Sequence, residues 1–255
     1  MIAKTIEKNI IATTSKNYEN FLKNHLQNME KPTVISFNWE LLADNVLFAQ
    51  NSMDHFSDVY SVDYGADFIR IDERGIRQNN RVALYSLLKL HGSLNWMHCP
   101  KCVHNNLFFV YGGKPAIPIL EGELIQCPKC KRCLKSVIVP PSFQKIGEGN
   151  ELSFLSYIWA KAKSSLINAD KIIIIGYSFP DDDVHFKHFL RGALVSNYRK
   201  NKNKGIKIEV VNFKMYSQDK IDFEKHYKDI LSIPGVKIEV NFLYQKFSEY
   251  AKGNH

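Results

Sequence analysis

The sequence predicts an α/β protein, with a Rossmann-like, doubly wound, mostly parallel sheet and an inserted small zinc-binding module. The first observation is a regular alternation of short apolar runs and amphipathic stretches after residue 136. The second is a group of five cysteines, four of which form two Cys-Pro-Lys-Cys motifs. The chain has 255 residues and is 45% apolar, which suits one such domain. We expect 1–96 and 137–255 to form the α/β domain and 97–136 the zinc module.

The first third of the chain contains two short apolar runs and two stretches of helical character. Residues 33–37 are rich in β-branched side chains and predict a buried strand, which Pro32 separates from the helix before it. Residues 51–82 are polar and mixed and give no clear signal. The expected elements are a helix over 5–30, a strand over 33–37, a helix or turn over 41–49 and an apolar run over 84–91.

The second half gives the strongest evidence for a parallel sheet. The run from Ile172 to Ile175 predicts a strand that is parallel to its neighbours and buried on both faces. Asp182 or Asp183 would cap the helix that follows it. Alternating strands and helices of this kind favour a parallel sheet with helices on both faces. The expected strands cover 136–139, 171–175, 206–212 and 236–242, with helices over 152–168, 184–196 and 222–230 between them.

The paired cysteines predict a metal site. Each motif can present two thiolates to one ion, so Cys99, Cys102, Cys127 and Cys130 would complete a tetrahedron around Zn²⁺. Four thiolates close the coordination shell, so the zinc is expected to be structural. Cys133 is a spare that could replace Cys130, and His98 or His104 could also substitute, but the doubled motif favours the four cysteines.

Charge and cysteine usage limit the partners. The net charge is +8, and basic residues cluster near Lys129 and in the run 199–207. A solvated lysine-rich loop explains these clusters; nucleic acid is the alternative, but no aromatic stacking motif accompanies them, so we expect no such partner. The sequence shows no run of about 18 apolar residues and no signal peptide, so we expect no membrane contact. Clustered Cys-x-x-Cys pairs predict a reducing, cytoplasmic compartment.

Three short segments follow predicted strands in one order: Phe37-Asn38-Trp39-Glu40, Leu90-His91-Gly92-Ser93 and Gly176-Tyr177-Ser178. In an open α/β sheet, ligands bind beyond the carboxyl ends of the strands. This order, with the cysteine module eight residues after His91, resembles the sirtuins and the broader SIR2-like family. The phrases KLHGSLNW, VPPSF and IIGYSFPDDDVHF resemble its prokaryotic branch. The resemblance covers about residues 31–215.

The resemblance implies an NAD-consuming enzyme, an NAD⁺ glycohydrolase rather than a protein deacylase, and a connection with defence against phage. His91 would be the general base that activates water or a ribose hydroxyl. Asn38 would order the nicotinamide-side ribose or the water, and Glu40 would support the carboxamide pocket. Each has a structural alternative, because His91 could be a buried, satisfied histidine and Asn38 could cap the next helix.

The same resemblance implies a nucleotide site. Gly176 and Ser178 would hold phosphate, and Asn212 would bind the adenine-side ribose of NAD⁺. Gly176-Tyr177-Ser178 could instead be an ordinary turn after a strand. Asp181–Asp183 could suggest a metal site, but aspartates are common at helix N-termini because of the helix dipole.

Two departures from the family pattern lead to a second hypothesis. Glu40 stands where the family has Asp, and the printed sequence lacks the Gly-Ala-Gly-x-Ser loop that cradles the pyrophosphate; its first glycine is Gly65. We therefore expect weak NAD⁺ binding by this chain, and an upstream reading frame that encodes such a loop would restore the enzyme. The alternative function is a catalytically incomplete module that binds an ADP-ribose-like nucleotide, a partner protein or a second copy of itself.

Overall fold

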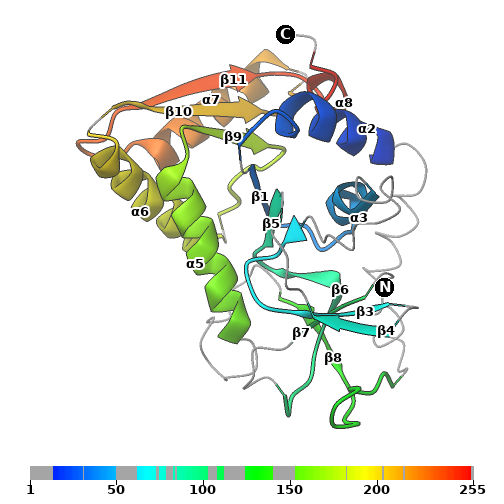
Figure 1. The fold of residues 1–255 in the computed structure, drawn as a ribbon. Helices are drawn as coiled ribbons and strands as arrows, with labels where there is room; N and C mark the ends of the chain where they lie inside the picture. Colours follow the sequence, from blue (N-terminus) through cyan, green and yellow to red (C-terminus); the bar gives the residue numbers. More distant parts are fainter. Residues whose placement is uncertain are drawn as a thin grey trace.

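The protein is described from a computed structural model and is a mixed α/β molecule whose strands pair mostly in parallel (Figure 1). The helix expected over 5–30 is found as α2 (Thr14–Phe21) and the π-helical turn η1 (Leu22–Leu26); residues 5–13 lie outside the described part. The described residues are 14–30, 32–49, 62–72, 75–78, 83, 85–102, 108–111, 124–139, 153–181, 183–202, 204–214 and 216–253.

The first sheet contains both early strands that the sequence predicts. β1 (Thr33–Ser36) and β5 (Tyr85–Lys89) pair in parallel, with Thr33 opposite Ser86 and Ser36 opposite Lys89. The short strand β2 (Val62–Asp63) pairs in parallel with the other side of β5 and gives the order β1-β5-β2. The helix predicted after β1 is α3 (Leu42–Ala49), which packs near β5.

The second sheet consists of the three last predicted strands, in the order β11-β10-β9, with both pairings parallel. Its strands are β9 (Lys171–Ile175), β10 (Ile206–Val211) and β11 (Ile238–Leu243). The predicted helices are confirmed with longer bounds for the last two: α5 (Ser153–Asn168), α6 (Val184–Lys200) and α7 (Ser217–Leu231). A short helix that was not predicted, α8 (Phe247–Tyr250), packs against α2.

The third sheet corrects part of the prediction. The strand expected at 136–139 is present as β8 (Lys135–Ile138), but it pairs antiparallel with β6 (Gly92–His98) and does not begin the parallel alternation. The reason is that the chain returns from the cysteine motifs beside β6. The five-stranded order is β4-β3-β7-β6-β8, which takes in strands outside 97–136. Three of its strands were not predicted: β3 (Ile69–Asp72), β4 (Gly75–Gln78) and β6. The fourth, β7 (Phe108–Tyr111), lies in the cysteine stretch 97–136, where glycines and prolines predict hairpins and loops.

The two parallel sheets share one hydrophobic core. Leu87, Leu88, Ile172 and Ile208 belong to one cluster of buried side chains, although they come from both sheets. The prediction that β9 is buried on both faces is wrong in part, because only Ile172 is buried and the next three isoleucines are half-buried. β9 is an edge strand that pairs with β10 alone in the described structure, so one side of it lacks a covering neighbour.

Among the described residues, no helix is long and apolar enough to cross a membrane.

Candidate functional site

His91 lies in the turn between β5 and β6, at the carboxyl end of β5. Its side chain is only 7% exposed, and among the described residues its Nε2 atom has no hydrogen-bond partner. Its backbone carbonyl accepts a hydrogen bond of 2.9 Å from the N–H of Val139. Burial lowers the pKa of His91, and the nearby Asp183 opposes this effect in part. The imidazole is therefore held neutral near pH 7, and the described part of the chain leaves its Nε2 atom without a hydrogen-bond partner.

Gly92 explains why glycine follows this histidine. Its backbone has φ +81°, and a Cβ atom placed there would lie 2.0 Å from the carbonyl oxygen of Val137 on β8. No side chain fits between the two strands, so glycine is required both by conformation and by close approach. The His-Gly pair is thus fixed by β8, which crosses directly beside the turn.

Aromatic side chains bring the carboxyl ends of β1, β5 and β9 together. The ring of Phe37, just after β1, stacks on Tyr177, just after β9, with centroids 4.6 Å apart. The same Phe37 ring lies 5.6 Å from the ring of His91. The hydroxyl of Tyr177 donates to Asp183, whose carboxylate also accepts from the N–H of Phe186 and so caps α6. The cap predicted at Asp182 or Asp183 is therefore Asp183.

The sequence prediction placed the three segments at strand ends but assigned no role to Phe37 or Tyr177, and it considered Asp183 only as a cap of the next helix. An aromatic residue directly before Asn38 and another directly after Gly176 was the available signal. Apolar residues that flank polar residues at strand ends can pack on each other and fix the polar groups between them.

Asn38 and Glu40 have different surroundings. Asn38 is exposed; its backbone N–H donates to the Ser36 hydroxyl at 3.1 Å, and its side-chain amide has no partner among the described residues. The carboxylate of Glu40 instead accepts from the N–H of Leu42 and from the hydroxyl of Tyr18. Burial raises the pKa of Glu40, although these hydrogen bonds and Lys89 oppose the rise. The Glu40 carboxylate is thus engaged at the start of α3.

The expected nucleotide residues lie at the ends of β9 and β10. The N–H of Gly176 donates to the carbonyl of Val211 at 2.9 Å, so this group already completes the sheet and is not available to a phosphate. Gly176 has φ +66° and open space where a Cβ would stand. Ser178 is exposed and Asn212 half-buried, and neither side chain has a partner in the described part of the chain.

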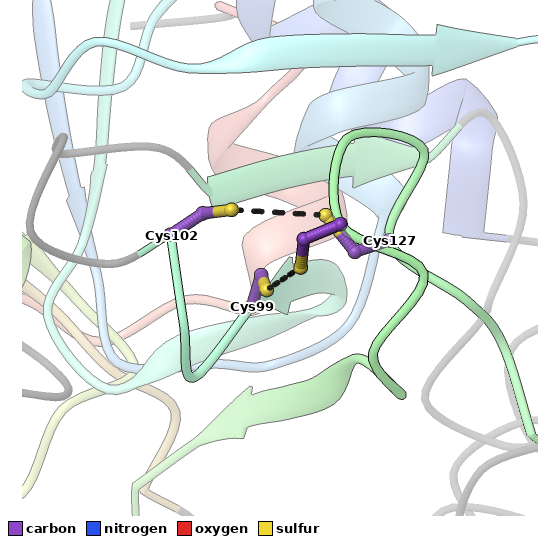
Figure 2. Close-up of side chains that lie close together, drawn as sticks. Cys99, Cys102 and Cys127 are labelled. Atoms are coloured by element: carbon purple, nitrogen blue, oxygen red, sulfur yellow. Dashed lines mark hydrogen bonds between the residues drawn. The ribbon is translucent and has the colours of Figure 1, made fainter.

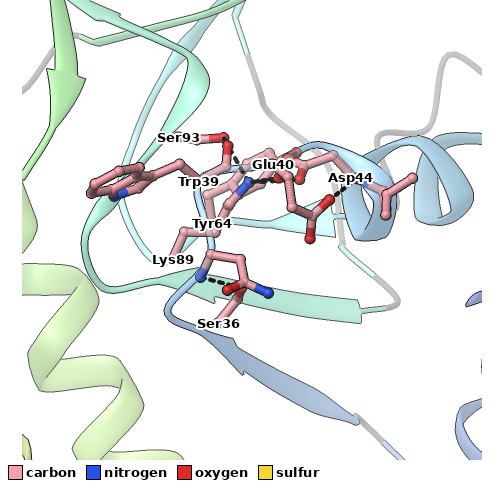
Figure 3. Close-up of polar contacts among 9 residues, drawn as sticks. Ser36, Trp39, Glu40, Asp44, Tyr64, Lys89 and Ser93 are labelled. Carbon is pink, nitrogen blue, oxygen red and sulfur yellow. Dashed lines mark hydrogen bonds and ion pairs between the residues drawn. The ribbon is translucent and has the colours of Figure 1, made fainter. Parts of the chain in front are cut away.

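A buried polar group lies directly beneath the segment 37–40 and was not predicted (Figure 3). The ammonium group of Lys89, 1% exposed, donates to the Glu40 carbonyl at 2.5 Å, to Asp44 Oδ2 at 2.9 Å and to the Ser93 hydroxyl at 2.7 Å. Tyr64 donates to the other oxygen of Asp44 at 2.7 Å. The signal was a lysine inside the apolar run Leu87–Leu90, where a charge requires buried partners.

The four cysteines of the two motifs form one cluster (Figure 2), as predicted. Their sulfur atoms all lie within 4.8 Å of one another; Cys99 and Cys130 are 3.3 Å apart, and Cys102 and Cys127 are 4.0 Å apart. Four thiolates on one Zn²⁺ at about 2.3 Å would be separated by about 3.8 Å, so the cluster could hold a metal ion and is compatible with zinc.

The local fold explains how the cysteines converge. Cys99 directly follows β6, and the N–H of Cys102 closes a tight turn on the carbonyl of Cys99 at 3.1 Å. The second motif closes in the same way, with the N–H of Lys131 donating to the carbonyl of Cys127 at 2.9 Å. Cys133 is exposed, bridges Gln126 through the backbone and does not belong to the cluster.

Models of protein families, the curated proteins and the solved structures were all compared with the chain, and none of them matches it.

Proposed function

We propose that this chain is a SIR2-like protein of the prokaryotic branch that acts as an NAD⁺ glycohydrolase. The observation that carries the proposal is His91, a buried imidazole at the point where three strand ends meet, whose Nε2 atom has no hydrogen-bond partner among the described residues. A neutral base in a protected position beyond the carboxyl ends of parallel strands fits the general location of ligand sites in α/β sheets. The order of the parallel strands supports the interpretation of both parallel sheets as parts of one Rossmann-like, doubly wound sheet.

The proposed reaction breaks the bond between nicotinamide and the ribose carbon of NAD⁺. The bonding electrons leave with nicotinamide, and the sugar passes through an oxocarbenium-like state. A water molecule then forms the new carbon–oxygen bond, and His91 takes up its proton. Asn38, whose amide is exposed and has no partner in the described structure, would orient this water or the adjacent ribose. An acyl oxygen in place of water would make the same site a deacylase.

The remaining expected residues would bind the other end of the nucleotide. The hydroxyl of Ser178 lies after β9, and the amide of Asn212 lies after β10, the neighbouring strand. Because the strands are adjacent, the two side chains can contact one extended dinucleotide. We assign them to phosphate and to the adenine-side ribose respectively. Gly176 contributes a backbone turn without a side chain rather than a hydrogen-bond donor.

We assign a structural Zn²⁺ to Cys99, Cys102, Cys127 and Cys130. The sulfur separations fit a tetrahedral ion, and four protein ligands leave no open position for a substrate or water. The zinc would fix the end of β6, which begins at Gly92 beside His91. Its contribution to the site is therefore indirect, through the position of β6.

The test is release of nicotinamide by the purified chain and by His91→Ala. We expect His91→Ala to remove any turnover while the far-ultraviolet circular dichroism stays that of a folded protein. His188→Ala is the matched control, because His188 is exposed on α6. Turnover that survives His91→Ala at the parent rate would remove His91 from the role of base.

A second function is favoured by two specific observations: the Glu40 carboxylate is engaged by Leu42 and Tyr18, and the Gly176 N–H is engaged by Val211. A site with these groups engaged would bind an ADP-ribose-like nucleotide or a partner protein without cleaving NAD⁺. Calorimetry separates the two functions. Binding of ADP-ribose that Asn212→Ala weakens, with no nicotinamide release even after a peptide that carries Gly-Ala-Gly-x-Ser is added, supports the second function and contradicts the first.

A further inference from the structure

Three loops meet at the amino end of the second sheet. Because β9, β10 and β11 are parallel, the loops that lead into them from α5, α6 and α7 lie at the same end, away from the arrowheads in Figure 1. The N–H of Ile206, which begins β10, donates to the carbonyl of Lys237 at 2.9 Å, and the side chain of Lys200 donates to that of Asn168. The three loops therefore form one continuous surface.

This surface, which we call the basic end, carries an excess of positive charge. It comprises the described residues within 168–171, 199–209 and 232–239, and its acidic residues are Asp170, Glu209 and Glu239. Its seven basic residues are all exposed: Lys171, Arg199, Lys200, Lys202, Lys204, Lys207 and Lys237. The excess of four charges is half of the +8 net charge of the whole chain.

Only part of this charge is compensated by the protein itself. The carboxylate of Glu209 pairs with Lys171 at 3.0 Å, and that of Glu239 pairs with Lys237 at 3.4 Å. In the described part of the chain, no ion pair involves Arg199, Lys202, Lys204 or Lys207. Four exposed positive charges at the basic end are thus available to an anionic partner.

Two of the lysines lie side by side on the sheet. Lys171 and Lys207 are register partners on β9 and β10, so their side chains leave the same face of the sheet. Like charges in such positions repel each other and destabilise the sheet. Glu209, two residues after Lys207, forms its ion pair with Lys171. An anion bound at the basic end would offset the charge of Lys207 as well.

The composition of the basic end indicates which anion it fits. Among its described residues, no large apolar side chain is exposed. Protein interfaces use aromatic anchors, membrane-binding helices use an apolar face, and proteins that bind single-stranded nucleic acid use stacked aromatic rings. The phosphate backbone of a duplex needs none of these, because basic side chains contact its phosphates directly. The basic end therefore fits a duplex nucleic acid.

We infer that the basic end binds the phosphate backbone of duplex nucleic acid without reading its sequence. By sequence alone the run 199–207 fits a solvated loop, since no aromatic motif accompanies it. The structure adds Lys171 and Lys237 to this run from two other strands, and backbone contacts need no aromatic motif. The basic end lies opposite the carboxyl ends of the strands, where Gly176 and Asn212 follow β9 and β10, so the inference does not rest on the proposed NAD⁺ chemistry.

The experiment measures the fluorescence anisotropy of a labelled DNA duplex of about 20 base pairs, titrated with the full chain at several salt concentrations. Four contacted phosphates predict a slope of about −3.6 when the logarithm of the association constant is plotted against that of the salt concentration. The affinity should therefore fall about a hundredfold between about 50 and 200 mM salt. Duplexes of different sequence should bind with affinities that agree within about threefold.

The variant Lys204→Gln/Lys207→Gln removes two of these four charges. We expect it to weaken binding at least about tenfold at about 50 mM salt and to reduce the slope by about two, because each phosphate contact contributes about one. Lys23→Gln/Lys252→Gln is the matched control, because it changes the net charge equally. Both of these lysines are exposed beyond the opposite end of the sheet, on η1 and after α8. The control should keep the affinity and the slope of the parent, and circular dichroism checks that both variants are folded.

Several results would overturn the inference. No binding of the duplex at about 50 mM salt contradicts it directly. Equal weakening in the two double variants would show that the net charge alone attracts the duplex. Polyglutamate that displaces the duplex at equal charge concentration would assign the basic end to an acidic protein. Binding to vesicles of phosphatidylserine and phosphatidylcholine without binding to the duplex would assign it to a membrane surface. Release of nicotinamide plays no part in these readouts, so failure here leaves the NAD⁺ proposal untouched.

Discussion

Lys89 Nζ lies 2.9 Å from Asp44 Oδ2, and each side chain is only 1% exposed. Removal of one partner leaves an uncompensated buried charge, which costs about 3–5 kcal/mol. We therefore expect Lys89→Met to lower the free energy of unfolding by this amount in denaturant titrations. The double variant Lys89→Met/Asp44→Asn should recover part of the loss, because it removes the second charge as well.

The control for this prediction is an exposed ion pair. Lys237 lies 3.4 Å from Glu239, with side chains 69% and 56% exposed. Solvent screens such a pair, so Lys237→Met should change the free energy of unfolding by less than about 1 kcal/mol. Similar losses in Lys89→Met and Lys237→Met would contradict the role assigned to burial.

The cysteine cluster predicts one zinc ion per chain. Metal analysis of the purified protein should give a ratio near one, and a chelator that removes zinc should lower the thermal midpoint. Cys127→Ser should lose the ion and destabilise the five-stranded sheet, because ligand binding and folding are coupled. Circular dichroism and the metal content of the purified variant check both effects.

Cys133→Ser provides the matched comparison for Cys127→Ser. Both cysteines lie in the same short segment, but Cys133 is exposed and does not belong to the cluster. The substitution should leave the zinc content and the thermal midpoint unchanged. A parent protein that is folded but contains no zinc would contradict the prediction of a structural zinc ion.

Alanine substitutions at two glycines with positive φ distinguish the cost of backbone strain from the cost of steric overlap. Both Gly92→Ala and Gly176→Ala place a side chain in the left-handed region, which costs about 1–2 kcal/mol. At Gly176 nothing lies within 4 Å of the added Cβ, whereas at Gly92 the Val137 carbonyl oxygen lies 2.0 Å away. Gly92→Ala should therefore lose about 1–3 kcal/mol more. Equal losses in chemical denaturation would show that β8 moves aside without cost.

The strands of the two parallel sheets and the metal ligands were largely predictable, because each follows from a local pattern. The isoleucine run predicted β9, and the doubled Cys-Pro-Lys-Cys motif predicted the cysteine cluster. The edge position of β9 was not predictable, because it depends on which strand lies beside it. The antiparallel pairing of β8 was missed for the same reason: a four-residue strand does not specify its partner.

The sequence predicted which segments form the site, but it did not predict the contacts between their side chains. The sequence indicated that the segments beginning at Phe37, Leu90 and Gly176 follow strands, and the structure brings Phe37, His91 and Tyr177 together. It did not indicate that the Glu40 carboxylate turns toward Leu42, because Asn-x-Glu fits both a binding residue and a helix start. The hairpin of β3 and β4 was missed because four-residue strands alternate too briefly to stand out in a polar stretch.

His91 predicts a pH dependence of stability. Burial lowers its pKa in the folded state below the unfolded value of about 6.5, so the unfolded chain binds the proton more readily. Neutral His91 therefore makes its full contribution to the free energy of unfolding above about pH 6.5. It is lost as the pH falls through the folded pKa. The difference in unfolding free energy between the parent and His91→Gln should shrink between pH 7.5 and 5, and a constant difference would contradict the burial effect.

The last prediction is that the chain by itself binds NAD⁺ weakly and releases nicotinamide at a negligible rate. A bound pyrophosphate needs backbone N–H groups that offset its desolvation, and the N–H of Gly176 already donates to Val211. The printed sequence contains no Gly-Ala-Gly-x-Ser segment, and the edges of β1 and β9 have no partner strand among the described residues. Ser178 and Asn212 can still contact a nucleotide fragment, so ADP-ribose should bind detectably but weakly in calorimetry.

A peptide that joins an apolar strand to Gly-Ala-Gly-x-Ser should raise the affinity for NAD⁺ at least tenfold, because it supplies the strand and the phosphate donors together. Micromolar affinity with steady turnover in the absence of the peptide would show that groups already present in this chain bind the phosphates.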